Sequence, residues 1–139
     1  MSKQVLDIKQ MQHLEELGVD TSKANFYWHR TKSLNNYNDW DEWILHYGVL
    51  RLARGFTTIN CQYVRTFTLQ DILDLLPKEI SVYGVAHVLN VIFHNEDLWE
   101  VSYCFGGRCE EYFMDETLID ASYEMLCWCA ENGYVDTKK

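Results

Sequence analysis

Three short segments within residues 87–114, in which apolar and polar side chains alternate, constrain the fold more than any other feature. Residues 95–97 and the pair Gly106-Gly107 separate these segments and have the composition of tight turns. Strands joined by short turns pair antiparallel. The pattern therefore predicts a three-stranded meander with strands at 87–93, 99–103 and 109–114.

Helices are predicted on both sides of this meander. Thr68 and Asp71, and again Thr117 and Asp120, have the spacing of a capping box, in which two side chains satisfy free backbone N–H groups at a helix start. Pro77 cannot continue the helix that begins at Thr68, which therefore ends there. Together with an amphipathic segment near the N-terminus, the pattern predicts helices at 7–17, 67–77 and 115–132.

Two further segments, 26–29 and 43–47, are rich in aromatic residues and favour strands. The Asn- and Asp-rich residues 34–42 between them predict a hairpin with a long loop. Residues 48–65 fit a helix or a strand, although 56–64 favour a strand. The fold expected is one α+β domain over residues 1–139: an antiparallel sheet, made of the hairpin and the meander, with about three helices mainly on one face.

The composition is that of a small globular protein. Of 139 residues, 47% are apolar, which is enough for a core and too much for disorder. No apolar run reaches membrane-spanning length, and the N-terminus resembles no signal peptide, so a cytoplasmic location is expected. The five cysteines, an odd number, are then expected to be free thiols.

Negative charge is concentrated in the second half of the chain. Residues 1–65 carry eight basic and seven acidic side chains, whereas residues 66–139 carry four and fourteen. This acidity disfavours nucleic acid and anionic membranes as partners and favours solubility or a basic protein partner. Glu110, Glu111 and Glu116 are the candidate acidic interface; the alternative is that the acids are spread over the surface.

The sequence contains no recognisable catalytic or metal-binding motif. Cys104 and Cys109 are too far apart for a zinc knuckle, and a disulfide between them is disfavoured in a reducing cytoplasm. Cys127 and Cys129 would point about 200° apart on a helix and cannot share one ion. No catalytic residue, metal or cofactor is expected, and a binding protein is favoured over an enzyme.

Two segments are candidate contact surfaces. Tyr37, Trp40 and Trp43 lie in or beside the polar loop and are the first candidates for binding a protein, unless Trp40 folds back onto the hairpin. Residues 43–70 lack acidic side chains and combine aromatic residues with arginines, a pattern that also fits single-stranded nucleic acid. The arginines of this alternative are Arg51, Arg54 and Arg65.

Three blocks of sequence carry a family resemblance: QMQHLEELGVDTSKA (10–24), TFTLQDILDLLPKEI (66–80) and LIDASYEMLCWCAENGYV (118–135). In these blocks the chain resembles small uncharacterised proteins of gut Bacteroides-type bacteria and their prophages or mobile elements. The resemblance implies a bacterial or phage protein that acts inside the cell. The leading hypothesis is therefore an accessory protein that binds another protein; the alternatives are a nucleic-acid-associated protein and an unrecognised enzyme.

Overall fold

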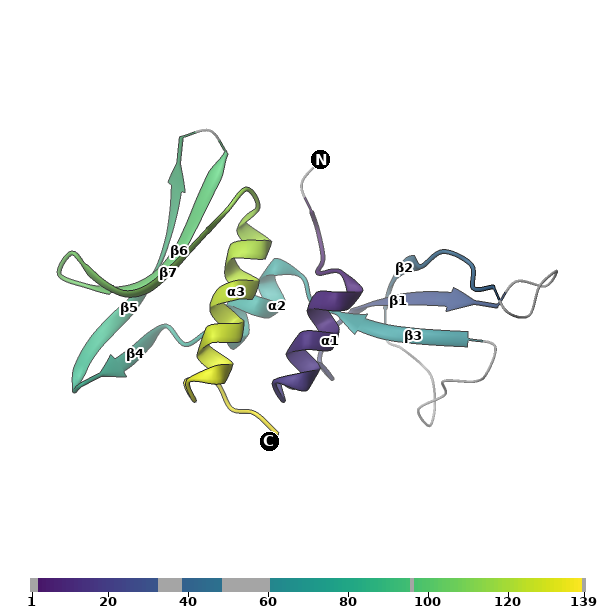
Figure 1. Cartoon of the computed structure of the whole chain (residues 1–139), viewed down its shortest axis with the longest axis horizontal. Coiled ribbons are helices and arrows are strands. Elements are labelled where there is room, and N and C mark those ends of the chain that lie inside the picture. Colours follow the sequence, from purple (N-terminus) through teal and green to yellow (C-terminus); the bar gives the residue numbers. More distant parts are fainter. Residues whose placement is uncertain (1–2, 33–38, 49–60, 96, 139) are drawn as a thin grey trace.

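The computed structural model describes residues 3–32, 39–48, 61–95 and 97–138. These residues form an elongated molecule with a β-sheet at each end and three helices between the sheets (Figure 1). The α+β class and the antiparallel pairing are confirmed. The predicted hairpin and meander, however, belong to two separate sheets, and each sheet contains one more strand than expected.

The smaller sheet has the strand order β2-β1-β3 and is antiparallel throughout. Its strands are β1 (Phe26–Thr31), β2 (Ile44–Tyr47) and β3 (Cys61–Thr66). Strands β1 and β2 are the predicted hairpin. Strand β3 accounts for the end of the segment that the sequence left open, while residues 49–60 lie outside the described residues.

The larger sheet has the order β4-β5-β6-β7 and curls strongly (Figure 1). Strands β5 (Val85–His94), β6 (Leu98–Phe105) and β7 (Arg108–Asp115) are the predicted meander, and β4 (Glu79–Val82) extends it. Strand β4 escaped prediction because its turn lacks the usual sequence signal. Tyr83 and Gly84 both have positive φ angles, 50° and 79°, and tyrosine rarely occupies that conformation.

Two of the described helices begin at the capping side chains that the sequence predicted. Helix α2 (Leu69–Leu75) has the complete capping box of Thr68 and Asp71, and the hydroxyl of Thr117 accepts the Asp120 N–H at the start of α3 (Leu118–Glu131). Asp7 caps α1 (Ile8–Glu16). Among the described helices, none combines the length and apolar character needed to cross a bilayer.

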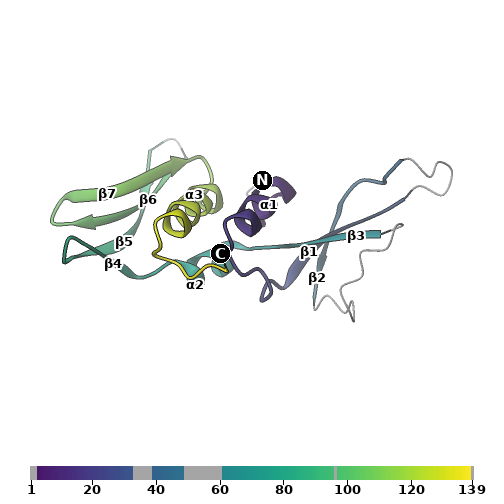
Figure 2. The ribbon, with the colours of Figure 1, turned by 60° about the horizontal axis from the view of Figure 1, so that its bottom comes forward.

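Helix α3 forms the centre of the core. Its residues Met125 and Leu126 are fully buried, as are Val101 and Tyr103 on the face of β6 that α3 covers. The Tyr103 hydroxyl donates a 2.7 Å hydrogen bond to the carbonyl of Pro77, which ties β6 to the end of α2. The same core continues through α2 into α1 and the smaller sheet, so the helices connect the two sheets (Figure 2).

Asp120 fastens the N-terminal segment to the start of α3. Its carboxylate accepts hydrogen bonds from Lys3 Nζ at 2.8 Å, Gln10 Nε2 at 2.9 Å and Thr117 Oγ1 at 2.7 Å. Burial alone raises the pKa of Asp120, but these three hydrogen bonds outweigh it and hold the pKa below its usual range. The ionised carboxylate is therefore the form that stabilises the fold.

Asp120→Asn tests this junction. Because the folded-state pKa of Asp120 is depressed, its contribution is present above the unfolded-state pKa of about 4 and is lost as the pH falls through the folded-state value. The variant should lose about 1–3 kcal/mol of unfolding free energy at pH 7 and less at pH 3, where part of this stabilisation is already gone from the wild type. Urea unfolding at both pH values measures this, with the exposed Glu42→Gln as control; a loss of equal size at both would contradict the account.

Candidate functional site

One face of the larger sheet is not covered by the described helices. Side chains alternate along a strand, so Val101 and Tyr103 of β6 point toward α3 while Glu100 and Ser102 point away from it. We call the side that bears Glu100 and Ser102 the outer face. The strand register places on it Val88, Asn90, Ile92 and His94 of β5, and Tyr112 and Met114 of β7.

Large apolar side chains on the outer face remain exposed. The exposed fractions are 51% for Val88, 42% for Ile92, 55% for Tyr112 and 38% for Met114. Val88 and Ile92 come from β5, and Tyr112 and Met114 come from β7, so they flank β6 on both sides. An antiparallel sheet with one solvated face ordinarily carries polar side chains there, and this face follows the rule only in part, because these four apolar side chains lie among its polar ones.

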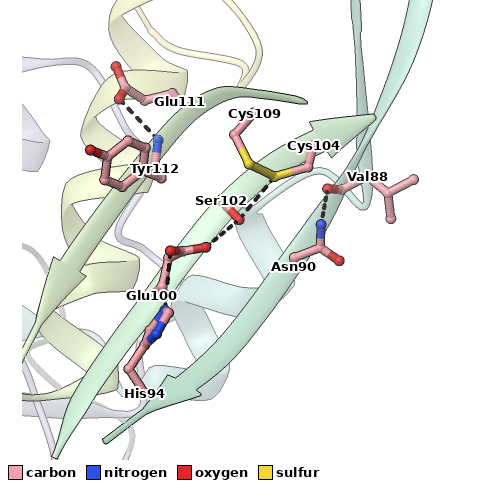
Figure 3. Close-up of a disulfide and its surroundings, with 9 residues drawn as sticks. All are labelled: Val88, Asn90, His94, Glu100, Ser102, Cys104, Cys109, Glu111 and Tyr112. Atoms are coloured by element: carbon pink, nitrogen blue, oxygen red, sulfur yellow. Dashed lines mark hydrogen bonds and ion pairs between the residues drawn. A yellow bond between two sulfur atoms is a disulfide. The ribbon is translucent and has the colours of Figure 1, made fainter. Parts of the chain in front are cut away.

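A row of hydrogen-bonded polar groups runs along β6 between the two apolar flanks (Figure 3). Glu100 is its centre: one carboxylate oxygen lies 3.2 Å from His94 Nε2, and the other accepts the Ser102 hydroxyl at 3.2 Å. The Cys104 sulfur lies 3.3 Å from the Ser102 oxygen and continues the row to Cys109, to which it is bonded. The central polar groups of the face are thus paired with one another.

The order of groups in this row is not that of a hydrolytic triad. In such triads an imidazole lies between the carboxylate and the nucleophilic hydroxyl. Here the carboxylate of Glu100 lies between His94 and Ser102, and Ser102 has no exposed surface. These hydrogen bonds satisfy polar atoms that lie between apolar side chains, and the arrangement offers no activated nucleophile.

The expectation that all five cysteines are free is wrong, because Cys104 and Cys109 form a disulfide. Glu110 is an extra, unpaired residue in β7 and forms a β-bulge. The resulting shift of the β6–β7 register places Cys109 opposite Cys104. Gly106 and Gly107 both have positive φ angles and form the tight turn that joins β6 to β7. The two sulfurs are thereby held within bonding distance by the hairpin itself.

The other three cysteines are free thiols. Cys127 and Cys129 are buried in α3, and burial raises the pKa of each thiol to about 11. A thiol with so high a pKa is a poor nucleophile and a poor metal ligand at neutral pH. Within the described residues, no three His, Cys, Asp or Glu side chains are arranged to hold a metal ion.

The structure does not gather the acidic residues that the sequence proposed as an interface. Glu110 is exposed in the bulge near the start of β7, whereas the exposed Glu116 follows the opposite end of that strand. Glu111 lies opposite Tyr103 on the side that faces α3, and its carboxylate accepts the backbone N–H of Tyr112 at 3.0 Å. These three acids therefore form no common surface.

Trp40 folds back onto the hairpin, which is the alternative that the sequence left open. The Arg30 guanidinium carbon lies 4.8 Å from the Trp40 ring centroid and 4.5 Å from that of Trp43. Both indoles are half-buried against this cation. Tyr37 lies outside the described residues, and a role in binding for the three aromatic residues stays a prediction.

The basic segment proposed for nucleic acid gains no observation in its favour. Arg51 and Arg54 lie outside the described residues, and the Arg65 guanidinium donates a 2.8 Å hydrogen bond to the Ser22 carbonyl. Beside Arg65, the aromatic rings on the same face of the smaller sheet stack on one another. The stacked pairs are Tyr27 with His46 (centroids 5.2 Å apart) and His29 with Tyr63 (4.8 Å apart).

Sequence reasoning missed the polar row, although β6 carries a signal for it. Glu100, Ser102 and Cys104 recur at every second residue and therefore share the face opposite Val101 and Tyr103. Their partners on β5 and β7 follow only from the register. Comparisons of the chain with protein-family models, curated proteins and solved structures find no match.

Replacing both Cys104 and Cys109 by alanine tests the disulfide. The two cysteines are five positions apart, and closing so short a loop stabilises the folded state by about 2 kcal/mol. We expect a loss of that size in urea unfolding, reproduced by reducing the wild-type protein. Counting reactive thiols in the unfolded, unreduced protein is the direct check: three agree with the structure, and five would refute it.

Proposed function

We propose that this protein binds another protein through the outer face of its larger sheet. The observation that carries the proposal is the exposure of Val88, Ile92, Tyr112 and Met114 on the face that no described helix covers. A sheet normally buries an apolar face against a second layer of structure. The exposed apolar side chains form two strips, one on β5 and one on β7, with the polar row of β6 between them. Exposed apolar surface bordered by polar groups is characteristic of an interaction site.

The polar row makes this face easier to desolvate. Glu100 and Ser102 already hydrogen-bond to each other, and Glu100 also to His94, so a partner that covers them displaces few hydrogen bonds to water. Ser102 is fully buried in the isolated chain. The gain from covering the apolar flanks is therefore opposed by little polar desolvation.

Charge defines the chemistry of the partner. The described residues of the outer face include the carboxylates of Glu79 and Glu100 and neither lysine nor arginine. Residues 66–139 as a whole carry fourteen acidic and four basic side chains. The partner surface that complements this face is apolar with basic residues at its margin, because complementary potentials guide association.

The family resemblance supplies the biological setting of the proposal. It supports an accessory protein of a phage or mobile element that works inside a bacterial cell. The disulfide Cys104–Cys109 bears on this setting, because disulfides are rare in a reducing cytoplasm. The hydrogen bonds of Glu100 and the apolar flanks do not involve the disulfide, so the proposed interaction does not depend on whether Cys104 and Cys109 are oxidised or reduced.

Charge insertion on the outer face tests the proposal. Affinity capture from the native host with the wild-type protein and with Ile92→Glu should recover the same principal partner at least tenfold less with the variant, because a buried unpaired carboxylate opposes association. Ile44→Glu is the matched control: Ile44 is 57% exposed, but on β2 of the smaller sheet. It should capture the partner as the wild type does.

Two results would count against the proposal. Undiminished capture by a folded Ile92→Glu protein would place the interface elsewhere. A stable homodimer in sedimentation equilibrium that Ile92→Glu dissociates would show that the face binds a second copy rather than another protein. Circular dichroism of each variant confirms that the fold is retained.

A further inference from the structure

A second surface lies on the opposite side of β7 from the outer face. It is a groove of about 290 Å³ between α1, α3 and β7. Its aromatic lining consists of Phe113, Tyr123 and Trp128, and its acidic lining consists of Glu124 and Glu131. Phe113 pairs with Val101 and so points to the helix side of the sheet, whereas its neighbour Tyr112 belongs to the outer face.

Helix α3 supplies most of the groove from one side. Glu124, Trp128 and Glu131 are four and three residues apart, a spacing that places them in a row along one face of a helix. The Trp128 indole is held in place by stacking on Tyr134, with centroids 5.3 Å apart. The groove therefore presents a fixed aromatic ring between two carboxylates.

No lysine or arginine among the described residues compensates the negative charge of the groove. Within the described residues, Glu124 and Glu131 form no hydrogen bond or ion pair, and the lining contains neither lysine nor arginine. The lining does include His13, whose ring packs edge-on against Tyr123. Burial, together with the nearby carboxylates of Asp115 and Asp120, raises the pKa of Glu124. A partly buried carboxylate among other carboxylates gains stability from a bound cation.

We propose that this groove binds the side chain of an arginine from a basic peptide segment of a partner protein. A guanidinium group is planar, stacks on an indole ring and donates hydrogen bonds to carboxylates at the same time. The groove offers the indole of Trp128 and the carboxylates of Glu124 and Glu131 within one cavity. Its net negative charge selects a cation over a neutral apolar side chain.

This site is independent of the outer face. The two surfaces share no residue and lie on opposite sides of β7. A partner that uses one of them need not use the other. A negative result for the outer face would therefore not argue against the groove, and a negative result for the groove would not argue against the outer face.

The test is a titration with a capped alanine peptide that contains one arginine, and with the same peptide in which citrulline replaces arginine. Citrulline keeps the shape of arginine and removes its charge. The readout is the indole ¹H–¹⁵N signal of Trp128 in the full-length protein. We expect a saturable shift with the arginine peptide and an apparent affinity at least tenfold lower with the citrulline peptide.

Substitutions in the groove complete the test. Glu124→Gln and Glu131→Gln should each weaken binding of the arginine peptide at least fivefold, because each removes one carboxylate and keeps the side-chain volume. Glu116→Gln changes the net charge by the same amount at an exposed position outside the groove and should leave the affinity unchanged. Equal binding of the two peptides, no shift of Trp128, or equal effects of all three substitutions would overturn the proposal.

Discussion

The packing of α3 against one face of β6 is the interaction on which the rest of the structure depends. Met125 and Leu126 of the helix are buried in the same core as Val101 and Tyr103 of the strand. The Tyr103 hydroxyl bonds to the Pro77 carbonyl, and burial raises the pKa of this hydroxyl far above its ordinary value, so it stays a neutral donor. Because α2 packs against α3 and α1 packs against β3 of the smaller sheet, no described helix covers the other side of the larger sheet, which is the outer face.

The strands and helices were predictable where the signal is local. The alternation in β6 and the capping side chains Thr68 and Thr117 act within a few residues, and they define the meander and two helix starts. Features that depend on pairing were not predictable. The disulfide requires the bulge at Glu110, and β4 requires an uncommon turn at Tyr83. Both are properties of a register, which a single sequence does not specify.

The candidate site was harder to predict for the same reason. Strand β5 carries apolar residues in both phases of its alternation, with Leu89 toward α3 and Ile92 on the outer face, so its sequence does not indicate which face is covered. The sequence left open whether the acidic residues gather or spread, and the structure places Glu110 and Glu116 near opposite ends of β7. The groove combines β7 and α3, which follow each other in the sequence, with α1, which lies near the N-terminus. Only tertiary packing brings such residues together.

The central claim is that the outer face is an open apolar surface that a protein partner covers. It is tested most directly by the effect of a soluble paramagnetic agent on the methyl NMR signals of the isolated protein and of its complex. The account predicts strong relaxation of Ile92 and Met114 in the isolated protein, none for Val101 and Met125, and protection of Ile92 and Met114 in the complex. If Ile92 and Met114 were as protected as Val101 in the isolated protein, or stayed exposed in the complex, the account would be contradicted.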